Sequence, residues 1–205
     1  MNDGPRQARS AATLERILSA ALVEFRADGF RGAGIAAICK RAGVSPGNLY
    51  HYFSGKEEIV AAIVERDRAH IRGVIEQLLS SDTPIQAIVN AITSKPPRDG
   101  FGMDAVLSLE IYAEAARNQA IGQILQDFSR GLRAEAVDML EALKARGDIA
   151  PTTDLSAAAD LMIALVDGVM VQRAVMDPQG DPSAFTKPLE RMLAGLLNGQ
   201  LSKEE

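Results

Sequence analysis

The chain of 205 residues is 47 % hydrophobic and 24 % charged, the composition of a globular protein that is long enough to bury its own core. Its single cysteine, Cys39, excludes an intramolecular disulfide framework and fits a reducing compartment. The N-terminal segment lacks the apolar core of a signal peptide, and the apolar stretch of residues 161–176 is interrupted by Asp167 and Arg173. We therefore expect a cytoplasmic protein with no membrane partner.

The net charge of −5 is distributed unevenly along the chain. Residues 1–56 hold eight Lys and Arg against four Asp and Glu, a balance of +4, so the remaining residues carry −9. A basic N-terminal quarter on an acidic body is the distribution expected of a nucleic-acid-binding head. A chance asymmetry of surface charge would give the same numbers, so charge alone does not decide between these interpretations.

Apolar residues recur at helical spacing throughout, and the alternating pattern of a strand is hard to find. Residues 10–27 are predicted as a first helix whose apolar stripe consists of Leu14, Ile17, Leu18, Ala21, Leu22 and Phe25. Gly29 is expected to supply the left-handed residue that ends this helix, with the apolar Phe30 after it. A second helix at residues 35–42, ended by Gly43, is too short to be stable without packing on its neighbours.

A tight turn and a third short helix are predicted next. Ser45 is a good N-cap and Pro46 suits the first position of a helix, so residues 43–44 are expected to form the turn. Two helices joined by a turn that contains glycine are typical of a helix-turn-helix. The run Ser-Gly-Lys-Glu at residues 54–57 is a capping-box pattern that opens a longer helix reaching residue 79.

The rest of the chain has the pattern of a helical bundle. Further helices are predicted at residues 83–92, 103–117, 121–146 and 155–176, followed by a last helix that ends near residue 197. Thr83 and Asp154 are expected to cap two of them. The predicted fold class is all-α, with a three-helix N-terminal helix-turn-helix domain over residues 1–54 and a helical bundle over residues 55–205.

Residues 45–53, placed on a helix, divide into two faces. Leu49 and Phe53 are one turn apart and Tyr52 lies close to their side, so these three are expected to pack inward. The residues expected to face outward are Pro46, Gly47, Asn48, Tyr50 and His51. The first residues of a recognition helix in the major groove lie nearest the base edges, so this outward set is a candidate DNA-reading surface.

The chemistry of the outward residues suits DNA. The Asn48 amide can read an adenine or reach a phosphate, and Gly47 allows close approach. Tyr50 and His51 are long hydrogen-bond donors whose expected targets are phosphate oxygens, and Lys56 adds an ammonium group at the start of the next helix. A purely structural alternative is open for each residue, with the two rings packed between helices and the lysine solvated.

The segment "GIAAICKRAGVSPGNLYHYFSGKEEI", residues 34–59, resembles the DNA-binding helix-turn-helix of the tetracycline-repressor (TetR) family of bacterial regulators. The preceding "ILSAALVEFRADGFRG", residues 17–32, is similar to the family's first helix, so the resemblance covers about residues 10–60. Beyond these residues the chain resembles the family in size, in helical character and in the phrase "ALVDGVMVQ", which is similar to the family's interface helix.

The resemblance implies a ligand-responsive transcriptional regulator, usually a repressor, which binds a palindromic operator as a homodimer and is released by a small apolar or amphipathic effector. The DNA-binding residues implied by position are Gly34, Ser45, Pro46, Gly47, Asn48, Tyr50, His51 and Lys56. On this basis residues 1–54 form the DNA-binding domain and residues 55–205 the ligand-binding and dimerisation domain.

The chain departs from the family pattern at the second helix. Gly34 stands where the family commonly has a threonine, whose hydroxyl caps the helix and touches a phosphate, and Ala37 lacks the polar group often found there. We therefore expect DNA binding to be retained but weaker. Arg6 and Arg9 are interpreted either as an arm for the minor groove or as part of a disordered terminus.

Two sets of residues in the bundle are candidates for its implied functions. The expected dimer interface consists of Leu161, Leu165, Gly168, Val169, Gln172, Leu189, Met192, Leu193 and Leu196. The expected effector-pocket lining consists of Met103, Leu107, Ile111, Tyr112, Phe128, Met139, Met162 and Met170. Ordinary core packing is the alternative for both sets. Glu110 and Glu114, one turn apart, are interpreted as a site for a cationic ligand or as a solvated face.

Competing classes of function have less support. His51 and His70 lie nineteen positions apart without Asp or Cys at ligand spacing, and the chain has neither a phosphate loop nor a dinucleotide fingerprint. We therefore expect no enzymatic activity, no metal and no cofactor. An interaction module that has lost DNA binding is a further alternative, because Gly34 and Ala37 weaken the motif.

Overall fold

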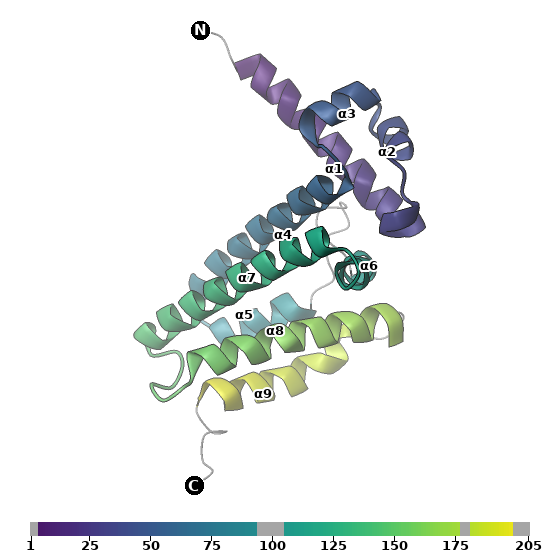
Figure 1. Cartoon of the computed structure of the whole chain (residues 1–205). Coiled ribbons are helices and arrows are strands. Elements are labelled where there is room, and N and C mark those ends of the chain that lie inside the picture. Colours follow the sequence, from purple (N-terminus) through teal and green to yellow (C-terminus); the bar gives the residue numbers. More distant parts are fainter. Residues whose placement is uncertain (1–3, 94–104, 177–180, 199–205) are drawn as a thin grey trace. The chain divides into compact units, whose positions relative to one another are not determined.

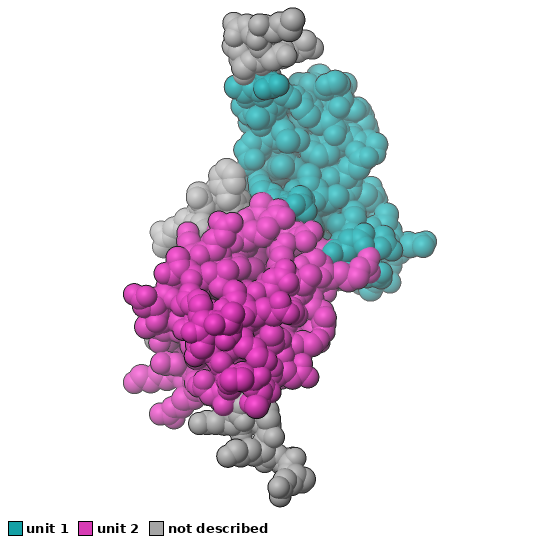
Figure 2. All heavy atoms as spheres, turned by 90° about the vertical axis from the view of Figure 1, so that its left-hand side faces the viewer, with its two compact units in different colours: residues 1–67, 97–127 teal, residues 68–96, 128–205 magenta. Residues whose placement is uncertain are grey.

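The computed structural model of the protein describes residues 4–93, 105–176 and 181–198. The chain forms two compact units, coloured separately in Figure 2. Unit 1 contains residues 1–67 and 97–127, and unit 2 contains residues 68–96 and 128–205. The bounds of these units differ from the expected domain boundary at residue 54. That boundary stays a prediction about functional domains. Two long helices, α4 and α7, run from one unit into the other.

Unit 1 begins with the helix-turn-helix at its N-terminal end (Figure 1). Its helices are α1 (Gly4–Gly32), α2 (Ile35–Ala42), α3 (Pro46–Tyr52), the first part of α4 (Lys56–Leu79), α6 (Ala105–Ala115) and the start of α7 (Gln119–Arg146). Helix α1 already begins at Gly4, so the segment around Arg9 is part of this helix rather than a disordered terminus, and its contact with the minor groove stays a prediction.

The break near the end of α1 lies at the predicted glycine. Gly29 has a φ of 70° and a ψ of 170°, a conformation essentially restricted to glycine, and the helix resumes for one short turn beyond it. Phe30 then packs its ring 5.6 Å from the ring of Phe25. The second predicted helix is confirmed as α2, and Gly43 ends it with a left-handed φ of 64°.

The buried side chains of unit 1 come from every helix in it. Those that are fully buried include Ile17, Leu22, Phe25, Ile38, Leu49, Ile59, Ile63, Leu107, Ile111 and Ile121. Helices as short as α2 and α3 depend on this shared core, because few intrahelical hydrogen bonds support them. On α4 the side chains of Ile59 and Ile63, one turn apart, are fully buried, whereas His70 further along the helix is exposed.

Unit 2 is a helical bundle with its own apolar core. Its helices are the second parts of α4 and α7 together with α5 (Pro84–Thr93), α8 (Leu155–Val171), a π-helical turn (Gln172–Met176), a 3-10 turn (Pro182–Phe185) and α9 (Thr186–Leu197). The core includes Ile88, Leu140, Leu143, Ala158 and Leu193. Arg133 of α7 binds Asp160 of α8 at 2.6 Å, and Thr153 donates a buried hydrogen bond to the Leu197 carbonyl at 2.8 Å.

The predicted helix starts are confirmed in part. Asp154 caps α8 by accepting from the backbone N–H groups of Ser156 and Ala157. At the start of α4, however, the capping acid is Glu58 rather than the predicted Glu57, because the helix begins two residues after Ser54. In the described part of the chain no helix is long and apolar enough to cross a membrane.

Candidate nucleic-acid interface

The recognition helix α3 is fixed by its own sequence at both ends. Ser45 precedes it in extended conformation, and its Oγ accepts the Asn48 N–H at 3.2 Å. Pro46 occupies the first turn, where its missing N–H costs nothing. Phe53 returns to extended conformation and ends the helix. Both predicted features of the helix start, the serine cap and the proline, are confirmed.

The two predicted faces of α3 are also confirmed by burial. Leu49 is fully buried and Phe53 is buried, which fixes the inward face in the core of unit 1. The outward residues, all exposed, are Pro46, Gly47, Asn48, Tyr50 and His51. Tyr50 is 56 % exposed, which is unusual for a large ring within a folded head. The helix therefore presents a polar and aromatic face that the described part of the chain leaves uncovered.

Tyr52 connects α3 to the N-terminal part of α1. It is half-buried, and its hydroxyl lies 3.1 Å from the Ser10 Oγ. The ring of His51 meets the Tyr52 ring edge-on, with centroids 5.3 Å apart and an angle of 81°. Tyr52 thus orients the His51 ring on the exposed face. The His51 side chain would therefore lose less conformational entropy on contacting DNA.

The start of α2 has room for a larger side chain. Gly34 is its N-cap without a side-chain hydrogen bond, and its carbonyl accepts the N–H groups of Ala37 and Ile38 at 3.0 and 3.1 Å. A Cβ added to Gly34 would meet no described heavy atom within 4 Å, and the same is true of Gly47. The departure from the family pattern at Gly34 is therefore not imposed by packing against the described residues of the chain.

Lys56 has a structural contact that the sequence did not indicate. Its ammonium donates to the carbonyl oxygens of Phe30 at 2.5 Å and Arg31 at 3.3 Å, and it lies 4.6 Å from the centre of the Phe30 ring. The lysine thus stabilises the carbonyl-rich end of α1, where a cation is favoured by the helix dipole. Its contact with a phosphate stays a prediction.

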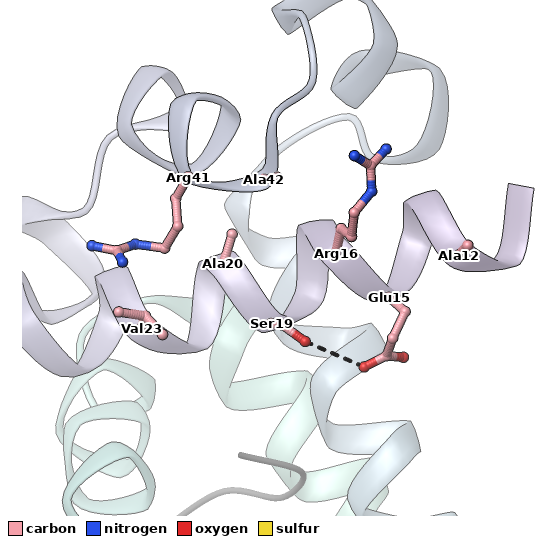
Figure 3. A pocket seen from close by; sticks show the side chains of 8 residues that line it. All are labelled: Ala12, Glu15, Arg16, Ser19, Ala20, Val23, Arg41 and Ala42. Atoms are coloured by element: carbon pink, nitrogen blue, oxygen red, sulfur yellow. Dashed lines mark hydrogen bonds between the residues drawn. The ribbon is translucent and has the colours of Figure 1, made fainter. Parts of the chain in front are cut away.

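Two arginines that the sequence reasoning did not single out, Arg16 and Arg41, line a groove between α1 and α2. This open groove of the head is lined by Ala12, Glu15, Arg16, Ser19, Ala20, Val23, Arg41 and Ala42 (Figure 3). The Arg16 guanidinium lies near the turn at Gly43, and the Arg41 Nε lies 2.5 Å from the buried Glu24 carboxylate. In the sequence, the excess of Lys and Arg in the first 56 residues was the feature that could have indicated both arginines.

The residues predicted to line an effector pocket are divided between the units. Leu107 and Ile111 are fully buried in unit 1, where Tyr112 is 38 % exposed. Met139 and Met162 belong to the apolar core of unit 2, and Phe128 and Met170 are half-buried there. Met103 lies outside the described residues. The effector pocket therefore stays a prediction.

The residues predicted for a dimer interface belong to two groups. Val169, Leu189 and Leu193 are buried in the core of the protomer itself. The outward or partly outward members are Leu161, Leu165, Gly168, Gln172, Met192 and Leu196. Leu161 is 55 % exposed and Met192 is 46 % exposed. A homodimer through α8 and α9 stays a prediction, and only this second group is available to it.

A three-helix head with one capped, exposed helix after a glycine turn defines the class of helix-turn-helix DNA-binding proteins. Comparison with known proteins agrees with this class. Residues 17–63 match the family described as "Bacterial regulatory proteins, tetR family", and residues 84–198 match "BetI-type transcriptional repressor, C-terminal".

Whole proteins of similar sequence and structure are also known. The HTH-type transcriptional regulator UidR of Escherichia coli (strain K12) is 30 % identical over 195 residues, covering 93 % of this chain and 96 % of UidR. The structure of Salmonella enterica GusR has a TM-score of 0.76 at 28 % identity and covers 90 % of this chain and 95 % of GusR. FadR from Bacillus subtilis, solved in complex with stearoyl-CoA, shares the fold with a TM-score of 0.71 at 19 % identity, covering 88 % and 97 % of the two chains.

The chain belongs to the TetR family of bacterial regulatory proteins. It is a DNA-binding helix-turn-helix transcriptional regulator, and its family and relatives are regulators rather than enzymes. The resemblance stated from residues 10–60 is thereby confirmed, and so is the all-α fold class.

Proposed function

We propose that this regulator is a repressor that binds a palindromic operator as a homodimer and is released by a small apolar or amphipathic effector. The observation that carries the proposal is the outward face of α3, where Asn48, Tyr50 and His51 are exposed while Leu49 is fully buried. A helix anchored on one side and uncovered on the other is the geometry that a major groove accepts.

The proposed contacts divide between bases and backbone. We expect Asn48, in the first turn of α3, to read a base edge, and Gly47 beside it to allow the backbone to approach the groove. We expect Tyr50 and His51 to donate hydrogen bonds to phosphates, and such contacts would fix the register of the helix. Arg16 adds positive charge beside the turn, which strengthens the sequence-independent part of binding.

Dimerisation through α8 and α9 would supply the second recognition helix. One α3 contacts too few bases for specificity, whereas a dimer places two such helices about 34–36 Å apart on a palindrome. The exposed side chains of Leu161 and Met192 are the apolar part of the proposed interface. Gly168, with open space at its Cβ position, allows close approach of a second copy.

Release requires an effector that binds the DNA-incompetent state more tightly than the competent state. The stearoyl-CoA bound to the FadR relative supports an apolar or amphipathic ligand for this chain. Because α4 is continuous from the head into unit 2, a shift of this helix would change the spacing of the two recognition helices. Native mass spectrometry of the purified protein would identify a ligand that it retains from the cell.

The DNA-binding test starts from duplexes that the protein selects out of a random pool. The chain has two histidines, both exposed, which provide a matched pair of variants. We expect His51→Ala to weaken binding of the selected duplex about fivefold or more, because a hydrogen bond to a charged group is lost. His70→Ala, on α4 beyond the head, is expected to leave the affinity unchanged.

Binding should also weaken steeply as the salt concentration rises, because phosphate contacts release counterions. Failure to select any duplex, or equal effects of the two histidine variants, would contradict the proposed interface. Lys56→Ala is a poor substitute for this test, because the ammonium also holds the Phe30 and Arg31 carbonyls and its loss would disturb the head itself.

A further inference from the structure

Two hydroxyl groups join the N-terminal half of α1 to α3, which lies beside it (Figure 1). The Ser10 Oγ of α1 and the Tyr52 Oη of α3 are 3.1 Å apart, although 42 positions separate the two residues along the chain. Both residues belong to unit 1. Each hydroxyl can donate and accept, so the pair forms one hydrogen bond in either direction. We refer to Ser10, Tyr52 and His51, whose ring meets that of Tyr52, as the α1–α3 contact.

Ser10 is a firm support because it lies inside a helix. The sequence predicted that this helix begins at residue 10, but α1 begins at Gly4, which places Ser10 in its second turn. Thr13 reinforces the same segment by donating to the Arg9 carbonyl at 2.9 Å. Since helical hydrogen bonds fix the backbone at this position, the Ser10 hydroxyl keeps a constant place relative to the rest of the head.

Tyr52 needs a support from outside α3. It is the last residue of a helix of seven residues, and the chain returns to extended conformation at Phe53. So short a helix has few hydrogen bonds of its own. Tyr52 is half-buried, so packing alone covers only part of its ring. Its hydroxyl lies at the far end of the ring, and any change of χ1 would carry it away from Ser10. The hydrogen bond therefore fixes the direction of the ring.

The ring of Tyr52 in turn sets the orientation of His51. The two ring centroids are 5.3 Å apart with an angle of 81° between the planes, the edge-on geometry that aromatic pairs prefer. His51 itself is exposed, so a ring without this neighbour would turn freely among its rotamers. Each rotamer given up on contacting DNA costs conformational entropy. The position of the Ser10 hydroxyl thus reaches the exposed face of α3 through two successive contacts.

We propose that Ser10 is a positioning residue for DNA recognition: its hydroxyl fixes Tyr52, and Tyr52 holds the His51 ring in the orientation that binds DNA. The inference rests on the proposed function, because it requires that His51 contacts the duplex. In this arrangement neither the Ser10 hydroxyl nor the Tyr52 hydroxyl touches DNA, since the two bind each other. Part of the affinity assigned to α3 is therefore determined by a side chain of α1.

A double-mutant cycle on the two hydroxyls tests the first contact. The probe is a duplex that the wild-type protein selects from a random pool, and gel shift gives the affinity. Ser10→Ala and Tyr52→Phe each remove one hydroxyl, and each is expected to weaken binding about threefold. The double variant should bind no more weakly than either single variant, because both substitutions break the same hydrogen bond. Independent, multiplying losses would show that the Tyr52 hydroxyl contacts DNA directly, and they would overturn the inference.

A second cycle tests whether the effect passes through His51. In the His51→Ala background, Ser10→Ala is expected to cause no further loss, because there is no ring left to orient. A merely structural role of Ser10 predicts the same threefold loss in both backgrounds, and that result would contradict the proposal. Ser10→Thr keeps a hydroxyl group at this position and is expected to retain the affinity of the wild type.

The matched control is Ser19→Ala, the same substitution in the same helix. The Ser19 Oγ donates to the Glu15 carboxylate at 3.4 Å and has no part in the α1–α3 contact. This variant is expected to bind the duplex as the wild type does. Alanine has a higher helix propensity than serine, which offsets the lost hydrogen bond, so the melting temperature of Ser10→Ala should change little. A lower affinity at unchanged stability is the expected signature of positioning.

The outcomes separate the two proposals. If the protein selects a duplex but Ser10→Ala and Tyr52→Phe bind it as tightly as the wild type, the inference is overturned, while the regulator function stands. A threefold loss in Ser19→Ala as well has the same consequence, because the effect would then not belong to the Tyr52 contact. If no duplex is selected at all, the proposed function fails, and the inference fails with it.

Discussion

Two glycines of the head, Gly34 and Gly47, lie at positions where the described part of the protomer leaves open space for a side chain. Gly34 caps α2 and Gly47 lies in the first turn of α3. Since neither residue has a positive φ, the backbone conformation does not require glycine at these positions. The role of these two glycines is therefore best tested by measuring DNA affinity rather than the stability of the fold.

At Gly47, stability and DNA affinity are expected to change in opposite directions. Gly47→Ala should stabilise the free protein by about 0.5 kcal/mol through helix propensity, and it should weaken binding of the selected duplex about tenfold because the methyl group meets the groove. Thermal unfolding and gel shift measure the two effects. Gly73→Ala on α4, which also has open space, serves as the control and should change stability alone.

At Gly34 a hydroxyl group should restore the contact that the family pattern implies. Gly34→Thr is expected to tighten binding of the selected duplex about fivefold, because a threonine hydroxyl can cap α2 and reach a phosphate. Gly34→Val has nearly the same shape without the hydroxyl, so it is the control. Equal affinities of the Thr and Val variants would show that no phosphate lies within reach of this position.

Among the helices, α4 shows how a local hydrogen bond sets the start of an element. The Glu58 carboxylate accepts the Ser54 N–H at 2.6 Å, and this hydrogen bond with the Ser54 backbone holds the Glu58 pKa below its ordinary value. Position 58 is the third residue of α4, which begins at Lys56. The cap therefore forms one residue later than the sequence pattern indicated.

The lowered pKa of Glu58 predicts a pH dependence of stability. Because the folded pKa is depressed, the stabilisation is fully present above the unfolded pKa of about 4.3 and is lost as the pH falls through the folded pKa. Glu58→Gln should therefore have a lower melting temperature than the wild type at pH 7. This difference in melting temperature should shrink as the pH falls below about 4.3. Glu76→Gln, near the other end of α4, should show no such deficit at pH 7.

For the whole molecule, we propose that exposed apolar side chains of α8 and α9 join two copies of the chain and so supply two recognition helices. The apolar side chains of Leu161, Val166 and Met192 are exposed on the protomer, whereas Val169 and Leu193 are buried in its core. Exposed apolar side chains that gather in one patch are typical of a protein–protein contact. This arrangement favours a second copy of the chain as the partner.

A single charge on this surface should dissociate the proposed dimer. Leu161→Glu is expected to convert the protein to a monomer at micromolar concentration and to abolish tight binding of the palindromic duplex, because a buried unpaired carboxylate costs several kcal/mol. Light scattering gives the mass. Val106→Glu on α6 is the matched control, since both residues are 55 % exposed, and should leave the mass unchanged.

The sequence by itself determined the helical elements and the exposed face of α3, because caps, glycine stops and helical periodicity are local. The bounds of α2, the Ser45 cap and the two faces of α3 follow from neighbours within a few residues. Tertiary structure decided which groups from distant segments meet. Glu110 reaches Phe30 across 80 positions and Lys56 reaches it across 26, and such pairs depend on how helices pack rather than on spacing along the chain.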